Sequence, residues 1–412
     1  MHRYALVLSL CGALGCGPVG AQRAALLADL RREPVTGTPP GEDPVDADGW
    51  HLALFHVHSA EGPYEARTRD ALSTRDNANP ARARQALRLA ASYGITALFL
   101  TDHNSLDAAL DRATVESAHA RGISLVPGSE YSLGGPLAFN LPITLGQAGP
   151  HFSFVGYAAK RPGDALVPAD TRARPSAGEW AALVEEVHAR GGAVVLSHPS
   201  ALNANWPGDA PPPADLVEVD GPLVHSPAAA RARWHEWLMQ GVRMGAISGA
   251  DWHVGVYPAA PFTHLNLVRA PSRTPAALAE ALRAGHLMVV TQAAKRPRVL
   301  LGADADGDGV FDDAREGDVL IPAPGSQRVR FQARAVGARG LALVLYTQVS
   351  REPVHKLTLH DSDEVRAWSM ALPEDGRAFV RAELWDGPHL RVLTNPLYFD
   401  PAPPGPRAGG SP

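Results

Sequence analysis

Short apolar runs alternate with amphipathic stretches along residues 49–296. The apolar runs end at glycine, proline or a polar residue, as buried strands do. The amphipathic stretches begin at residues such as Asn79 and stop at glycines such as Gly94, as helices do. This alternation predicts parallel strands joined by crossover helices, and such a sheet can close into a barrel. The predicted strands are 52–58, 97–101, 123–127, 151–157, 193–197, 216–219 and 244–248, and the predicted helices are 80–93, 106–121, 177–190, 227–240 and 274–284.

The pattern changes near residue 297, where short runs alternate apolar and polar positions between proline and glycine turns. This change predicts a small antiparallel β-sandwich over 297–400, after a first domain over 49–296. Residues 401–412 are rich in proline and glycine and predict a disordered tail. The clearest alternating runs are 328–333, 341–345 and 379–384.

An export signal is predicted over residues 1–21, followed by a linker over 22–48. The apolar run 4–10 is too short to span a bilayer and follows a basic residue, as in secretory signals. Cleavage after Ala21 would give a periplasmic or secreted protein. Alternatively, Ala-Leu-Gly ahead of Cys16 resembles a bacterial lipobox, and a lipid on Cys16 would anchor the protein to the bacterial envelope. Both alternatives remain open.

Composition restricts the class of protein. A length of 412 residues suggests two domains, and 45% hydrophobic with 20% charged residues is typical of a soluble globular protein. The formal net charge of -5 gives no reason to expect nucleic acid as a partner. The two cysteines both lie in the predicted export signal, so we expect no disulfide in the mature fold.

Histidine and acidic residues gather at the ends of the predicted strands. Because the ends of successive strands converge at the mouth of a barrel, we expect these side chains to meet there. Imidazole and carboxylate ligands together suit Zn, Mn or Fe. One such motif alone is more often incidental than functional, but several in order predict a metal site. The residues are His56, His58, His103, Glu130, His151, His198, Asp251 and His253.

The order of these motifs resembles that of the PHP superfamily (polymerase and histidinol phosphatase). The motifs are His-x-His-Ser, Thr-Asp-His, Pro-Gly-x-Glu, an isolated strand histidine, Ser-His-Pro and Asp-x-His, and the resemblance covers about residues 51–296. It implies an α/β fold, a distorted (β/α)7 TIM-like barrel that holds two or three divalent metals. The segment 281–286 and the last strands resemble the branch that contains the carbaryl-type carbamate hydrolases.

The resemblance also implies a ligand set. His56, His58, Glu130 and Asp251 match the ligands of a first metal, and Glu130 would bridge to a second metal with His151 and His198. His103 and His253 match two ligands of a third metal. Its last ligand is uncertain, and Asp76 and Asp70 are the candidates.

This ligand set predicts hydrolysis. A hydroxide between two cations could attack an ester, and the cations would stabilise the developing charge. Asp251 or His253 could take or return a proton as the leaving group departs. Asp102 and Glu218 could fix the histidine tautomers. We expect an exported hydrolase of a small-molecule phosphoester. The alternatives are hydrolysis of a carbamate or carboxylic ester, and a non-catalytic surface module that metal stabilises.

Three further features allow two interpretations each. The loop Asp304, Asp306, Asp308 and Asp312 resembles a calcium loop without the usual glutamate, so it predicts either a structural Ca²⁺ or an acidic turn. The arginines of 61–84 could grip an anion, although a solvated surface is the simpler interpretation. Trp252 could line the substrate pocket or pack in the core.

Overall fold

The computed structural model describes residues 35–37, 49–59, 78–131, 151–166, 176–199, 211, 213–222, 224, 226–254, 261–291, 297–322, 326–373 and 377–400. The predicted export signal with Cys16, most of the predicted linker, Asp70, Asp76 and the predicted tail lie outside these residues. Among the described residues, no helix combines the length and apolar character needed to cross a bilayer.

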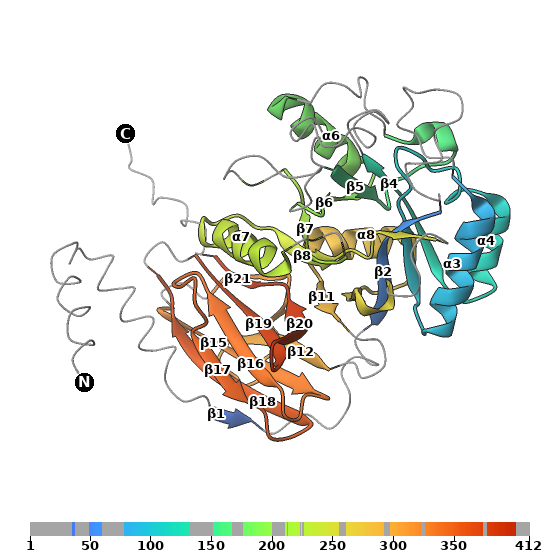
Figure 1. The fold of residues 1–412 in the computed structure, drawn as a ribbon. Coiled ribbons are helices and arrows are strands. Elements are labelled where there is room, and N and C mark those ends of the chain that lie inside the picture. The colour runs from blue at the N-terminus through green and yellow to red at the C-terminus, as the bar shows by residue number, and fades with distance from the viewer. Residues whose placement is uncertain are drawn as a thin grey trace, which may run out of the picture.

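The first part of the chain builds one large curled sheet with helices packed around it (Figure 1). Helices α3, α4, α6 and α7 lie against strands of this sheet. The strands are β2 (Trp50–His58), β3 (Ala97–Leu100), β4 (Ser124–Tyr131), β5 (His151–Val155), β6 (Ala193–Ser197), β7 (Leu216–Asp220), β8 (Gly245–Ser248), β9 (Trp252–His253), β10 (Leu265–Arg269) and β11 (Leu287–Val290). The helices are α3 (Pro80–Ser92), α4 (Arg112–His119), α6 (Ala177–Ala189), α7 (Pro227–Met239) and α8 (Pro275–Ala284), with short 3-10 turns η2 (Pro162–Asp164) and η3 (Pro261–Thr263).

The sheet curls until its last strands return to its first strand. β9 pairs in parallel with β2, with Val57 opposite Trp252 and His58 opposite His253. Just before this pairing, the Ala250 amide donates to the Phe55 carbonyl at 2.9 Å. The fold is therefore mixed α/β and barrel-like, which agrees with the general class that the sequence predicts.

The direction of two strands differs from the predicted all-parallel order. β5 is antiparallel to both β4 and β6, and β10 is antiparallel to β2. An antiparallel neighbour needs no crossover helix, and the alternation of apolar and polar runs carries no information on strand direction. The regular (β/α)7 repeat stays a prediction, because residues 132–150 after β4 lie outside the described part of the chain.

The helix predicted over 106–121 is shorter than expected. Helix α4 begins at Arg112, because the Asp111 side chain accepts from the Thr114 amide and caps its N-terminus. Leu106 is buried in turns ahead of the helix. Its apolar character was therefore mistaken for part of the helical pattern.

A central apolar cluster fills the concave side of the curled sheet. Every strand from β2 to β8, and β10, contributes a residue, including Phe55, Phe99 and Ile247. Helix α8 contacts β4, β6 and β10, which are separated from one another by other strands along the curled sheet. The helix therefore covers one open end of the curl. Leu278 and Leu282 extend from α8 into the same cluster. This core leaves only the other end, where β2 and β4 terminate, for polar chemistry.

The C-terminal strands form a second sheet and also extend the first. The second sheet has the order β1-β18-β15-β12-β13, in which β1 comes from the predicted linker and all pairs are antiparallel. Strand β20 pairs with β11, so β14, β16, β17, β19, β20 and β21 continue the curled sheet. The strands are β1 (Val35–Gly37), β12 (Arg298–Asp304), β13 (Ala314–Arg315), β14 (Val319–Leu320), β15 (Arg328–Val336), β16 (Ala342–Thr347), β17 (His355–Thr358), β18 (Asp363–Ala371), β19 (Ala378–Asp386), β20 (His389–Thr394) and β21 (Leu397–Phe399).

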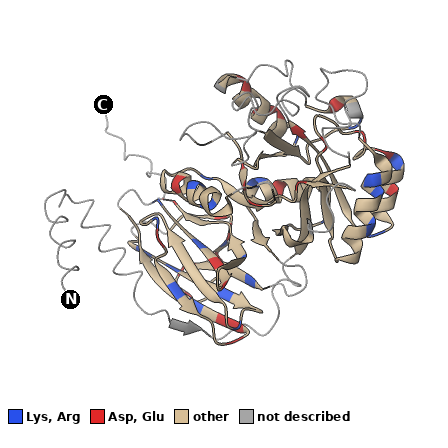
Figure 2. Cartoon of the chain, in the orientation of Figure 1, with Lys and Arg blue, Asp and Glu red and all other residues tan. Residues whose placement is uncertain are grey.

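The two sheets of the C-terminal part share a buried core. β12 lies against β19 and β20, and Phe331 of the second sheet is in one apolar cluster with Val380 of the first. Strand β11, before the predicted boundary near 297, and strand β20, after it, are hydrogen-bonded to each other in one sheet. The C-terminal sandwich and the division into two domains both stay predictions. Figure 2 shows basic positions on α3 and both basic and acidic positions on α4 and the C-terminal strands.

A buried histidine joins α7 to the C-terminal strands. His235 is 3% exposed, its Nε2 lies 2.8 Å from the Ser350 carbonyl, and its Nδ1 lies 3.4 Å from Arg381 Nε. Since Nε2 donates to the carbonyl and Nδ1 accepts from the guanidinium, this contact requires a neutral ring. Burial, reinforced by the Arg381 charge, lowers the pKa of His235 to about 4.

Acid is therefore expected to weaken this junction. Below a pH of about 6.5 the unfolded chain binds a proton on His235 that the folded chain takes up only near its lowered pKa. Stability should fall by on the order of 2 kcal/mol as the pH drops from 6.5 to 4, and should be constant with respect to this group above 6.5. Urea unfolding across this range measures the slope. His235→Gln should flatten it, and an unchanged slope in that variant would exclude His235 as the cause.

Candidate metal centre

Eight of the predicted ligands meet at the open mouth of the curled sheet. The mouth is where the parallel strands terminate, so β2 delivers two histidines and β4 delivers Glu130 at or near their ends. His151 stands at the start of β5, but because β5 is antiparallel, its start lies at the same mouth. His103 follows β3 and forms an isolated parallel β-bridge with Glu130 through the backbone. The remaining members are His198 after β6, Asp251 after β8 and His253 in β9.

Glu130 lies at the centre of this cluster. Its Oε2 is 3.0 Å from His103 Nδ1, 3.3 Å from His56 Nε2 and 3.4 Å from His58 Nε2. Its Oε1 is 2.9 Å from His151 Nδ1 and 3.0 Å from His198 Nε2. One carboxylate thus faces imidazoles from both sides, which is the arrangement that a bridging ligand requires.

Asp251 is the second carboxylate of the cluster. Its Oδ1 is 3.3 Å from His58 Nε2 and 3.5 Å from His253 Nδ1, and its Oδ2 is 3.9 Å from His198 Nε2. The cluster therefore contains two acids among six imidazoles. Four sets of three residues have ligand atoms within 4.8 Å of one another: His56, His58 and Glu130; His56, His198 and Asp251; His103, Glu130 and His151; and His58, His103 and His253.

The backbone is strained where it delivers these ligands. His56, His198 and Asp251 have φ angles of 64°, 27° and 39°, and Asn104, next to His103, has 49°. Such positive values cost non-glycine residues about 1–3 kcal/mol each and occur at functional sites. In β2 the positive φ of His56 coincides with a register shift between Leu54 and Val57. The strain indicates that ligand placement is favoured over local stability.

The charge balance of the cluster fits a divalent cation. Burial raises the pKa of Glu130, but the charges on His103, His56 and His151 oppose this and hold it well below its usual value. Burial likewise raises the pKa of Asp251, and the charge on His56 is the largest influence that lowers it well below the usual value. Both acids are therefore ionised in the cluster, where Glu130 is 0% and Asp251 6% exposed, and this negative charge suits a divalent cation.

The imidazoles respond in different directions. Burial lowers the pKa of His56, but Glu218, Glu130 and Asp251 raise it well above its usual value. His198 follows the same balance and its pKa is raised, whereas burial prevails at His151 and lowers its pKa. A cluster that combines neutral and charged rings around ionised acids can exchange protons for a cation.

Several buried atoms of the cluster lack a hydrogen bond within the described part of the chain. They are His56 Nε2, Glu130 Oε2, His151 Nε2, His198 Nδ1 and Asp251 Oδ1. A buried polar atom without a partner costs about 1–3 kcal/mol, so five in one cluster require an explanation. All five of these residues also belong to the four sets of possible metal ligands. The donor chemistry, burial and orientation of these residues fit a Zn, Mn or Fe ion.

Neighbouring polar residues hold the ligands and their turns. Glu218 Oε1 accepts from His56 Nδ1 at 2.6 Å, so the expectation that Glu218 orients a histidine agrees with the geometry. Asp102 instead accepts from both the amide and the hydroxyl of Ser59, each at 2.6 Å. It thereby fixes the turn that follows His58. The motif His-x-His-Ser contains Ser59, but the sequence did not indicate its role.

Two other predicted features, Arg84 and Trp252, belong to none of these sets of possible ligands. Arg84 is on α3, where its Nη1 lies 3.5 Å from the Asp111 carboxylate. Trp252 is 5% exposed and packs edge-on against Phe262 in a large apolar cluster, so it belongs to the core. Asp76, the candidate for the last ligand of the third metal, lies outside the described residues.

The acidic loop after β12 brings three carboxylates together. Asp304, Asp306 and Asp308 form one metal-competent set, which does not include Asp312. Asp313 closes the loop instead, because its Oδ2 accepts from the Ala305 amide at 2.6 Å. Asp304 Oδ2 also accepts from Arg330 Nη1 at 2.6 Å, which supplies part of the positive charge that a calcium ion would bring.

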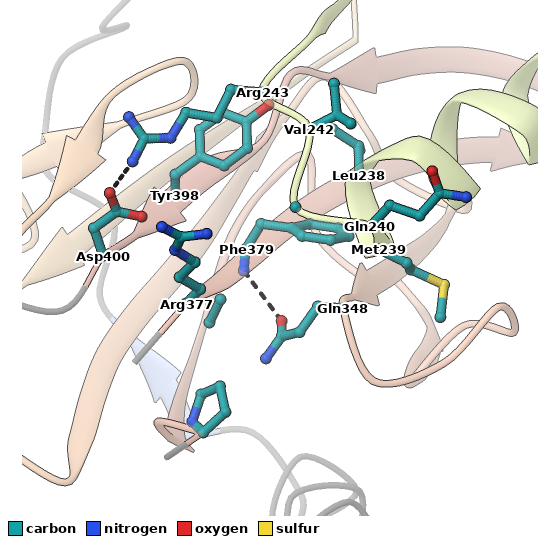
Figure 3. Close-up of a pocket in the computed structure, with 13 residues that line it drawn as sticks. Leu238, Met239, Gln240, Val242, Arg243, Gln348, Arg377, Phe379, Tyr398 and Asp400 are labelled. Carbon is teal, nitrogen blue, oxygen red and sulfur yellow. Dashed lines mark hydrogen bonds and ion pairs between the residues drawn. The ribbon is translucent and has the colours of Figure 1, made fainter. Parts of the chain in front are cut away.

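A separate pocket of about 430 Å³ lies at the end of α7, beside the C-terminal strands. Figure 3 shows Arg243 paired with Asp400 beside Tyr398, and the Phe379 amide donating to Gln348. None of the eight clustered ligands lines this pocket. The cluster, and not this pocket, is therefore the candidate for metal chemistry.

Comparison with known proteins adds little to this geometry. No protein family matches the chain, and no curated protein matches it. Among solved structures, the chain is similar to a metal-dependent phosphoesterase from Bifidobacterium adolescentis, with 13% sequence identity and a TM-score of 0.33. That match covers 50% of this chain and 89% of the other. The functional argument therefore depends on the residues of the cluster.

Proposed function

We propose that this protein is an exported metal-dependent hydrolase, and that its substrate is a small-molecule phosphoester. The observation that carries the proposal is the position of Glu130, within 3.4 Å of imidazole nitrogens from five histidines. With Asp251 beside them, these ligands fit two or three Zn, Mn or Fe ions. Such ions supply Lewis acidity, which makes water nucleophilic near neutral pH and stabilises charge on an ester.

The exposure of the ligands indicates the side from which substrate enters. The side chains of His56, His58 and Glu130 are 0% exposed, whereas those of His103 and His253 are 12% and 9% exposed. Solvent therefore reaches the cluster past His103 and His253. A substrate bound on that side would lie next to His253, which is also the side from which a leaving group would depart.

Asp251 and His253 are the residues we propose for proton transfer. His253 Nδ1 is 3.5 Å from Asp251 Oδ1, and both residues are next to the entrance. A proton held between them could be delivered to the departing oxygen of the substrate. Because Asp251 also contacts His58 and His198, this step would be coupled to the centre of the cluster.

Two other functions compete with this proposal. The branch resemblance favours a carbamate or carboxylic ester, whose carbonyl carbon could react at the same cluster. A non-catalytic module would use the metals only for stability, and the strained backbone at His56 and Asp251 weighs against it.

A substrate comparison tests the proposal directly. Protein loaded with Zn²⁺ or Mn²⁺ should hydrolyse 4-nitrophenyl phosphate with a kcat/KM at least about tenfold above that for 1-naphthyl methylcarbamate. The reverse order would favour the carbamate hydrolase. Absence of turnover with both substrates and with a broad ester panel would favour the binding module.

Export and calcium binding remain separate parts of the proposal. Export is supported by the apolar run 4–10, and the mass of the mature protein would distinguish cleavage after Ala21 from a lipid on Cys16. A structural Ca²⁺ is supported by the grouping of Asp304, Asp306 and Asp308. A thermal unfolding curve that does not respond to Ca²⁺ would exclude it.

A further inference from the structure

Glu218 is a buried acid that stands behind the metal centre. It lies in β7 and is 1% exposed, and it belongs to none of the metal-competent sets. Both of its oxygens are used: Oε1 is 2.6 Å from His56 Nδ1, and Oε2 accepts from the His198 amide at 2.7 Å. One carboxylate therefore contacts two ligands that come from different strands.

The contact with His56 fixes the chemical state of that ring. Because a carboxylate only accepts, Nδ1 must carry the hydrogen, which directs Nε2 into the cluster. His56 Nε2 lies 3.3 Å from Glu130 and 3.7 Å from Asp251. Without Glu218 the ring could rotate or adopt the other tautomer, and Nε2 would no longer be held toward the cation.

The contact with His198 acts on the backbone. The φ angle of His198 is 27°, a conformation that a histidine adopts only when the surroundings impose it. The bond from its amide to Glu218 opposes relaxation of this angle. The His198 side chain can then keep its Nε2 at 3.0 Å from Glu130 Oε1.

Two glycines make room for this arrangement. A Cβ atom on Gly249 would lie 2.1 Å from Glu218 Oε1, and one on Gly221 would lie 2.2 Å from the Gly249 carbonyl oxygen. Gly221 also has a φ of 151°, which side-chain-bearing residues rarely adopt. The backbone around the Glu218 carboxylate therefore has no space for a methyl group.

We propose that Glu218 is a positioning residue that holds one ligand of each of two metal ions, so that a single carboxylate supports both sites. This inference rests on the proposed function only in that the cluster binds metal. His56 and His198 share one set with Asp251, but they face opposite oxygens of Glu130: His56 faces Oε2, in the set with His58, and His198 faces Oε1. Loss of Glu218 should therefore weaken both ions together.

The chain contains a matched control in Asp215, just before β7. Its Oδ1 and Oδ2 are 3.0 and 2.9 Å from His188 Nε2, and its Oδ2 accepts from the Val194 amide at 2.8 Å. Asp215 thus contacts one imidazole and one backbone amide, as Glu218 does, but none of its partners is a predicted metal ligand. The two acids make the same kinds of contact, but only Glu218 makes them to predicted ligands; the Asp215 side chain is 13% exposed and that of Glu218 is 1% exposed.

The test compares Glu218→Ala and Asp215→Ala by Zn²⁺ titration against a chromophoric chelator, with metal content measured on the full-length protein. Glu218→Ala should weaken both bound ions by about 10–100-fold, and Asp215→Ala should leave both affinities unchanged. Wild-type affinity for either ion in Glu218→Ala, or equal weakening in Asp215→Ala, would overturn the inference. If the wild-type protein binds no Zn²⁺, Mn²⁺ or Fe²⁺, the proposed function fails instead.

A second variant keeps the test decisive if Glu218→Ala does not fold. Gly249→Ala keeps Glu218 in the sequence, but the added methyl group would push its carboxylate out of position. This variant should therefore also weaken Zn²⁺ binding. Gly178→Ala is its control, since a Cβ there would meet no atom within 4 Å. A Gly249→Ala protein that shows a cooperative unfolding transition is folded. Unchanged Zn²⁺ affinity in that protein would also overturn the inference.

Discussion

Glu130→Gln is expected to reduce ester hydrolysis by about a thousandfold or more, with little change in the fold. Both oxygens of Glu130 lie within 3.0 Å of histidine nitrogens, closer than either oxygen of Asp251. An amide replaces one of these oxygens with an NH2 group, which cannot bind a cation, and it removes the negative charge between the ions. Steady-state hydrolysis and metal content of the purified variant measure both effects.

The control for this variant is another fully buried glutamate. Glu316 is also 0% exposed, and its Oε2 accepts from the Leu301 amide at 3.0 Å, far along the chain from the cluster. Glu316→Gln should keep wild-type hydrolysis and metal content. If Glu130→Gln retained more than a tenth of the wild-type activity, Glu130 could not be a bridging ligand.

Removal of transition metals should inactivate the protein and also destabilise it. Removal takes away positive charge that faces two buried ionised acids, and the loss of one partner of a buried charge pair costs about 3–5 kcal/mol. For a chain of 412 residues that cost corresponds to a fall in Tm of about 4–6 °C. Differential scanning calorimetry before and after treatment with 1,10-phenanthroline measures it.

Add-back experiments identify which ion matters. Zn²⁺, Mn²⁺ or Fe²⁺ should restore both Tm and hydrolysis, whereas Ca²⁺ alone should restore neither, since the loop at Asp304 is separate from the cluster. The Tm of Glu130→Gln should respond much less to the chelator. A chelator-treated wild-type protein with full activity would be incompatible with metal-dependent hydrolysis.

Much of the secondary structure could be predicted because it is encoded locally. The apolar run that became β2 and the Asn79 cap that starts α3 each carry their signal within a few residues. The direction of β5 and the pairing of β11 with β20 could not be predicted in this way. These features depend on contacts between residues distant in the chain, which local periodicity does not record.

The candidate site was visible in the sequence for a different reason. Histidine and acid are rare at the ends of apolar runs, so residues such as His58 and His198 stand out against the pattern. Glu218 was harder to place, because an acid within a strand gives no sign of its partner. Glu218 and His56 are 162 positions apart in the sequence. They come into contact because the fold brings β7 and β2 to the same mouth of the sheet.

The pairing between β11 and β20 has a consequence for the integrity of the protein. Met288, Val289 and Val290 are opposite Thr394, Leu393 and Val392, so the last strands cover the outer edge of β11. A chain that ended after β11 would present an open row of amide and carbonyl groups beside three buried apolar residues. Exposed edges of that kind recruit strands from other molecules. We therefore expect that the pairing of β20 with β11 also prevents self-association through the edge of β11.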